Sequence, residues 1–155
     1  MKKIKPTLIT AIISFLLLSS CQQGEDEVIL LPSGYKGYVV ILYSQTNGNE
    51  QKYHKGQRIY NIPVSGILKT KFSENHGYTA IPRFYYGKID PYNSISFFAK
   101  SEDCKCNTVM ASGGSAGKAY KTNDDYIEFK TYFIGNKKDI AKAFEDVEKL
   151  DITKL

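Results

Sequence analysis

The sequence contains no Trp, only two His and only three Cys among its 155 residues. Structural metal sites are usually recognised by cysteines or histidines at short, regular spacing, and neither Cys-x-x-Cys nor closely spaced histidines occur here. Long apolar runs are missing too, because the apolar stretch 8–18 is well short of the roughly 20 residues that a membrane-spanning helix needs. These absences argue against a metal motif and against a transmembrane helix.

The sequence also lacks a large excess of either basic or acidic residues. The formal net charge is +5, but Lys2, Lys3 and Lys5 belong to a removable leader that is described below. The remaining chain carries 18 basic and 16 acidic residues, which are interspersed. Because binding to a phosphate backbone needs a clustered basic face, we expect no nucleic acid partner. The length suits one compact domain and leaves no room for a multidomain enzyme.

Residues 1–20 have the three parts of a secretory leader, namely a basic start, the apolar stretch and a small-residue pair. The segment Leu18-Ser19-Ser20-Cys21 then resembles a bacterial lipobox, in which the Cys receives diacylglycerol and becomes the new N-terminus. This resemblance implies a covalent lipid on Cys21, and we expect no other cofactor and no metal. Two or more acyl chains hold a protein on a bilayer where one would release it. The alternative is an ordinary Cys near a signal-peptidase site.

Residues 21–27 are predicted to form a short polar tether with three consecutive acids at 25–27. The run resembles the acidic export signals that send some Gram-negative lipoproteins to the outer face of the outer membrane. A solvated linker explains the acids equally well. The expected location is therefore the cell envelope, with the chain lipid-anchored to the outer membrane and exposed at the surface under the first interpretation.

Beyond the tether, short apolar and aromatic runs alternate with turn residues, a spacing typical of consecutive strands. The 12 Tyr and 8 Phe favour strands as well. The pattern predicts a mainly β domain over 28–155, a β-sandwich of about seven to nine short antiparallel strands, with a closed barrel as the alternative. Pro82 should place its strand at an edge or mark a bulge. The predicted strands are 28–31, 38–44, 51–54, 58–62, 67–72, 78–86, 94–100, 108–111 and 126–134.

Residues 137–150 change to helical spacing. Ile140, Phe144 and Val147 recur on one face, and Asn136 is a candidate N-cap. Basic residues at the start and acidic residues near the end oppose the helix dipole, so packing must stabilise this helix. We expect a C-terminal amphipathic helix that docks on the sheet through Phe144 and its neighbours.

Two stretches carry a family resemblance. The motifs are LPSGYKG at 31–37 followed by VVI at 39–41, and YNIPVSGIL at 60–68. They resemble a family of small bacterial lipoproteins classed only as a domain of unknown function. They are also similar to the turns of transthyretin-like and carboxypeptidase-regulatory-like sandwiches. Neither resemblance brings a catalytic residue to this chain.

Three groups of residues are candidates for chemistry. Residues 113–117 match Gly-x-Ser-x-Gly around Ser115, but the following segment lacks helical spacing, so we expect a flexible glycine loop and no hydrolase nucleophile. Cys104 and Cys106 could form a strained redox disulfide, ligate a soft metal with His54 or His76, or be structural.

The third group is aromatic. Tyr85, Tyr86 and Tyr92 could form an exposed patch that binds a glycan or a protein, although core packing explains aromatic residues as well. No complete catalytic set is present. The sequence therefore predicts a non-enzymatic envelope lipoprotein that acts as a binding or structural module on a lipid bilayer. The alternative is a thiol redox or metal-binding factor that uses Cys104 and Cys106, or a hydrolase.

Overall fold

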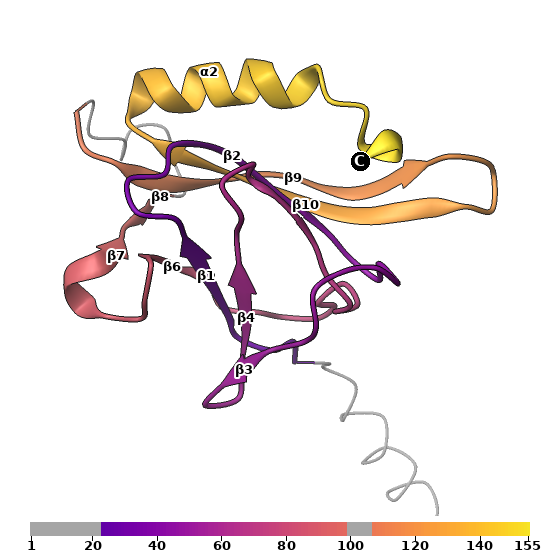
Figure 1. The fold of residues 1–155 in the computed structure, drawn as a ribbon, viewed down its shortest axis with the longest axis horizontal. Coiled ribbons are helices and arrows are strands. Elements are labelled where there is room, and N and C mark those ends of the chain that lie inside the picture. Colours follow the sequence, from indigo (N-terminus) through magenta and orange to yellow (C-terminus); the bar gives the residue numbers. More distant parts are fainter. Residues whose placement is uncertain (1–22, 99–106) are drawn as a thin grey trace, which may run out of the picture.

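The computed structural model describes residues 23–98 and 107–155 as two packed five-stranded sheets with a helix on the outer face of one (Figure 1). The first sheet has the order β3-β4-β1-β6-β7 and the second β5-β2-β10-β9-β8. No helix in this described part is long and apolar enough to cross a membrane. The elements are β1 (Glu27–Leu31), β2 (Gly37–Leu42), β3 (Tyr53–His54), β4 (Gln57–Asn61), β5 (Ile67–Lys69), β6 (Arg83–Tyr86), η2 (Pro91–Asn93), β7 (Ser94–Ile95), β8 (Phe97–Phe98), β9 (Met110–Tyr120), β10 (Tyr126–Gly135), α2 (Lys137–Glu148) and η4 (Ile152–Lys154).

The mainly β class with a C-terminal helix is confirmed, but the pairing of the strands is mixed. β1 runs parallel to both β4 and β6, β2 runs parallel to β5, and β8 runs parallel to β9. The expectation of antiparallel strands is therefore wrong for these pairs, and the described residues form ten strands where seven to nine were expected. The reason is that β1 and β2 lie in different sheets, so the chain crosses between the layers and returns in the same direction.

Two hydrophobic cores stack across the second sheet. The inner core lies between the sheets and holds residues such as Ile29, Phe84 and Tyr132. The outer core lies between the second sheet and the C-terminal segment, where Val40 and Leu42 meet residues of α2 and η4. Because β2 contributes to both cores, it needs apolar residues on both faces. This explains its continuous Val-Val-Ile-Leu run and confirms the sequence-based expectation of a central strand.

The helix begins as predicted, and its docking agrees with the prediction in part. Asn136 caps it, because its Oδ1 accepts hydrogen bonds from the backbone N of Lys138 and Asp139, while Asp139 returns one to the N of Asn136. The fully buried helix residue is Ala143, and the ring of Phe144 is 49 % exposed. The predicted docking through Phe144 and its neighbours is confirmed in part, because the ring of Phe144 contacts Phe133 of β10 and Val147 packs on the outer core, while Ala143 is the residue turned fully inward.

Residues 113–117 lie inside β9 and do not form the expected loop. Gly113 pairs with Tyr132 and Ala116 with Lys130, so Gly114 and Ser115 both stand opposite Thr131 as a β-bulge. The hydroxyl of Thr131 accepts from the N of Ser115 at 2.6 Å and donates to the O of Ser115 at 3.0 Å. The buried side chain of Thr131 thus supplies the backbone hydrogen bonds that the bulge removes from the ladder.

Pro82 lies just before β6, and the strand predicted over 78–86 is shortened to Arg83–Tyr86. β6 is an interior strand, with β1 on one side and β7 on the other. The expectation of an edge strand or a bulge at Pro82 is therefore wrong. Because Pro82 precedes the ladder, its missing N–H removes no hydrogen bond between strands.

The two neighbouring glycines of the bulge give a matched test. A Cβ on Gly114 would overlap the Oγ1 of Thr131 and lie 2.8 Å from the ring of Phe133, whereas a Cβ on Gly113 has its nearest neighbour at 3.6 Å. We expect Gly114→Ala to lower the free energy of unfolding by about 1–3 kcal/mol. Gly113→Ala should leave it unchanged. Urea denaturation measures both, and equal losses would contradict this account of the bulge.

Candidate functional site

The cysteines predicted to carry chemistry lie outside the described residues. Cys21, Cys104 and Cys106 fall within residues 1–22 and 99–106. Lipidation of Cys21, and a disulfide or metal site at Cys104 and Cys106, therefore stay predictions.

The three tyrosines of the predicted aromatic patch do not share one surface. Tyr86 packs against the inner core, and its hydroxyl donates to the backbone O of Tyr35 at 2.8 Å. Tyr85 follows the opposite face of β6, since successive strand residues alternate. Tyr92 stands alone on η2 and is 98 % exposed. Strand alternation separates Tyr85 from Tyr86, so the expected patch is not formed by these three rings together.

The geometry around Ser115 differs from that of a hydrolase nucleophile. The nucleophile elbow holds a Ser on a sharp turn between a strand and a helix. Ser115 instead lies in the middle of β9, with its backbone N and O both bonded to Thr131. Gly-x-Ser-x-Gly is here the sequence of a bulge.

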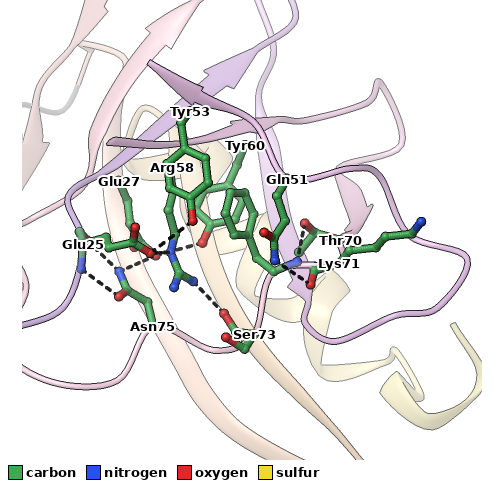
Figure 2. A network of polar contacts seen from close by, with 11 residues as sticks. Glu25, Glu27, Gln51, Tyr53, Arg58, Tyr60, Thr70, Lys71, Ser73 and Asn75 are labelled. Carbon is green, nitrogen blue, oxygen red and sulfur yellow. Dashed lines mark hydrogen bonds and ion pairs between the residues drawn. The ribbon is translucent and has the colours of Figure 1, made fainter. Parts of the chain in front are cut away.

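A polar network joins the start of the described chain to the first sheet (Figure 2). The Nε of Arg58 lies 2.5 Å from the Oε2 of Glu25, and its Nη1 donates to the backbone O of Ser73 at 2.6 Å. The guanidinium also lies 4.9 Å from the ring centre of Phe72. Asn75 closes the network, accepting from the N of Glu25 at 3.0 Å and donating to its O at 2.7 Å.

Glu27 is the buried acid of this network, with only 3 % of its surface exposed. Its Oε1 accepts from the hydroxyl of Tyr60 and from the Nδ2 of Asn75, both at 3.1 Å, and its Oε2 lies 3.5 Å from the Nζ of Lys130. The carboxylate therefore has two hydrogen-bond donors and a cation, as a buried charge requires. Burial, and then the charge of Glu27, raise the pKa of Tyr60 far above its ordinary value.

These contacts correct the predicted tether. Gln23 bridges to Tyr78, Glu25 pairs with Arg58, and Glu27 is the first residue of β1. Of the three acids predicted to be solvated at 25–27, only Asp26 is exposed. The folded body thus includes residues 23–27 and does not begin at 28. The composition of this segment does not distinguish Glu25 and Glu27 from the acids of a solvated linker. Their partners Arg58, Asn75 and Tyr60 lie 30 or more positions away in the chain.

One cluster has the donor types of a metal site. Ligand atoms of Glu74, His76 and Glu128 lie within 4.8 Å of one another. Imidazole and carboxylate groups suit a divalent first-row metal, although Lys118 already lies 3.7 Å from Glu128. His76 is a candidate ligand in the sequence, whereas Glu128 is not, because the loop that holds His76 meets β10 only in the folded chain. Glu74 lies only two residues before His76, so the sequence itself offered this acid as a partner. His54 lies apart on β3, and no contact joins it to this cluster.

A shallow apolar groove of about 750 Å³ lies between α2 and β9. It exists because α2 covers β2 and β10 and stops short of β9. Beyond Ser112, the outer edge of β9 pairs with no other strand of the part of the chain that the structure describes. The lining residues are Phe98, Phe133, Ile140, Ala141 and Phe144, with Ser112, Gly113, Gly114 and Ser115 on the floor and Lys137 and Glu145 on the helix side.

The fold defines a two-sheet, mainly β protein with a helix packed on one outer face. A family model matches residues 23–143, and the chain therefore belongs to that family of unknown function (DUF6843). This confirms the predicted membership of an uncharacterised family. No protein of curated function matches the sequence significantly.

A solved structure shares the fold. The 2.75 Å crystal structure of a candidate lipoprotein from Bacillus anthracis superposes with a TM-score of 0.54 at 14 % sequence identity. The match covers 75 % of this chain and 73 % of that chain. At this level of identity the likeness shows a common fold.

Glu27 and Glu50 give a test of the polar network. Removing Glu27 leaves the hydroxyl of Tyr60 and the Nδ2 of Asn75 without their buried acceptor. We expect Glu27→Ala to lower the free energy of unfolding by about 3 kcal/mol. Glu50→Ala, which breaks only the exposed pair with Lys71, should change it by less than about 0.5 kcal/mol. Chemical denaturation compares the two, and a similar loss for both would rule out a structural role for the network.

Proposed function

We propose that this protein is a lipid-anchored, non-catalytic binding module of the cell envelope. The leader at 1–20 and the lipobox-like segment that ends at Cys21 support the anchor. The shared fold with a candidate lipoprotein supports it as well. The use of Ser115 in a β-bulge supports a role other than hydrolysis.

The groove beside α2 is the observation that carries the binding role. Three phenylalanines, Phe98, Phe133 and Phe144, line it, and Phe144 lies 5.7 Å from Phe133 between ring centres. A contiguous apolar surface of this kind is typical of an interaction site, whereas a single exposed ring is not. In Figure 1, α2 lies on the side of the molecule opposite β3, near which the described chain begins. An anchor at Cys21 would therefore present the groove away from the bilayer.

The groove and the strand edge together favour a protein ligand over a glycan. Backbone N–H and C=O groups along the outer edge of β9 can pair with an extended peptide, which adds a strand to the sheet. Apolar side chains of that peptide would then enter the groove beside Phe144. We therefore propose an extended, apolar segment of a partner protein as the ligand.

Placement in the outer membrane is the finer part of the proposal. Its basis is the acidic run 25–27, of which Glu25 and Glu27 are bound to Arg58, Asn75 and Tyr60. Asp26 is the most exposed of the three acids, and it accepts a hydrogen bond from the Nε2 of Gln57. The proposal for the anchor itself does not depend on these acids.

The anchor is tested by replacing its cysteine. Cys21→Ser should abolish incorporation of labelled palmitate and move the protein from the membrane fraction to the soluble fraction of the cell. Cys104→Ser is the matched control and should leave both unchanged. Membrane retention of Cys21→Ser at the wild-type level would refute lipid anchoring.

The groove is tested by photo-crosslinking in cells that express the full chain. A benzoylphenylalanine at Phe144 should form one discrete cross-linked product. The same residue at the exposed Tyr92, which does not line the groove, should not. Ala141→Glu places a charge on the lining and should abolish the product. Identical products from both positions, or a product that survives Ala141→Glu, would count against a partner in the groove.

A further inference from the structure

Three parallel strands of the first sheet start at one end of the molecule. β1, β4 and β6 begin in register, because Glu27 pairs with Arg58 and Val28 pairs with Arg83. The segments that lead into these strands must therefore gather at the same end. Figure 1 shows this end, with the β3–β4 turn, on the side opposite α2. We call it the entry face, and it is formed by residues 23–26, 54–56 and 73–82.

Very little chain separates the entry face from Cys21. Gln23 forms a bridge with Tyr78, and the N of Gly24 donates to the O of Tyr78 at 3.0 Å. Cys21 precedes Gln23 by two residues, which span at most about 7 Å when fully extended. The headgroup layer of one bilayer leaflet is itself about 5–7 Å deep. A lipid on Cys21 would therefore hold the entry face within reach of the headgroups.

We propose that the entry face lies on the lipid headgroups with the ring of Tyr78 in the interfacial layer. This inference rests on the proposed anchor at Cys21. The side chain of Tyr78 is 80 % exposed, and a tyrosine combines the apolar ring and polar hydroxyl that favour the membrane interface. The bilayer that holds the lipid of Cys21 thus covers the ring of Tyr78, which the fold leaves exposed to solvent.

The entry face presents an exposed basic residue to the lipid surface. His54 and Lys55 are exposed on the β3–β4 turn, and a basic residue near an anionic surface is attracted to it. Three acids, Glu25, Asp26 and Glu74, lie on the same face, and each has a polar neighbour. Glu74 lies 3.8 Å from the Nδ1 of His76. Glu25 is paired with Arg58, and Asp26 accepts from the Nε2 of Gln57 at 3.3 Å. Their hydrogen bonds reduce the repulsion that free acids would bring.

The absence of Trp allows a single-residue reporter. Tyr78→Trp is placed in the full, lipidated protein, which is reconstituted into phosphatidylcholine and phosphatidylglycerol vesicles with brominated acyl chains. Tryptophan emission should shift to shorter wavelength and lose most of its intensity, because bromine quenches only rings near the lipid. Val64→Trp is the matched control, since Val64 is 84 % exposed and follows β4 at the opposite end. Its emission should not change.

Tether length provides the second arm. A spacer of about eight Gly and Ser residues between Gln22 and Gln23 adds an average reach of about 15 Å. Flotation with vesicles should persist, while quenching of Tyr78→Trp should be lost. Equal emission from Tyr78→Trp and Val64→Trp, in protein that is lipidated and floats, would overturn this inference and leave the anchor standing. Protein that carries no lipid and does not float would overturn both.

Discussion

The parallel alignment of β1 with β4 and β6 is the constraint on which the rest of the structure depends. β1 occupies the middle of the first sheet, so its neighbours must begin where it begins. This alignment brings the start of the described chain beside the loop that holds Asn75 and beside Arg58 on β4. The second sheet and α2 lie on the other side of the molecule (Figure 1). One end of the molecule is thus polar and linked to the predicted anchor, and the opposite side carries the apolar groove.

This layering buries the charged side chain of Glu27 and leaves the apolar ring of Phe144 partly exposed. Glu27 enters the core as the first residue of β1, where Tyr60, Asn75 and Lys130 converge from three other segments. A charge with these partners favours one register of the sheet, because a slip would leave it unpaired. Phe144 is the reverse case. Its helix is held by Ala143 and its neighbours, which leaves the aromatic ring free to line the groove.

Local patterns predicted local structure well in this chain. The helix expected over 137–150 is observed as Lys137–Glu148, and the cap at Asn136 is formed. The continuous apolar run of β2 correctly indicated burial on both faces. Predictions were wrong more often where one sequence pattern is compatible with two local structures. Gly-x-Ser-x-Gly predicts a loop because glycine is typical of turns, yet Thr131 supplies the hydrogen bonds that keep it in a strand.

The sequence by itself determined the strand-rich composition, the C-terminal helix and the lipobox-like segment at Cys21, because each depends on residues that are close together in the chain. Only the tertiary structure decided which strands are parallel, since side-chain periodicity is the same in either direction. It also decided that Glu25 and Glu27 belong to the fold, and that Glu74, His76 and Glu128 meet. Arg58 and Tyr60 lie 30 or more positions from Glu25 and Glu27, and Glu128 lies more than 50 positions from Glu74 and His76, so these contacts follow from topology.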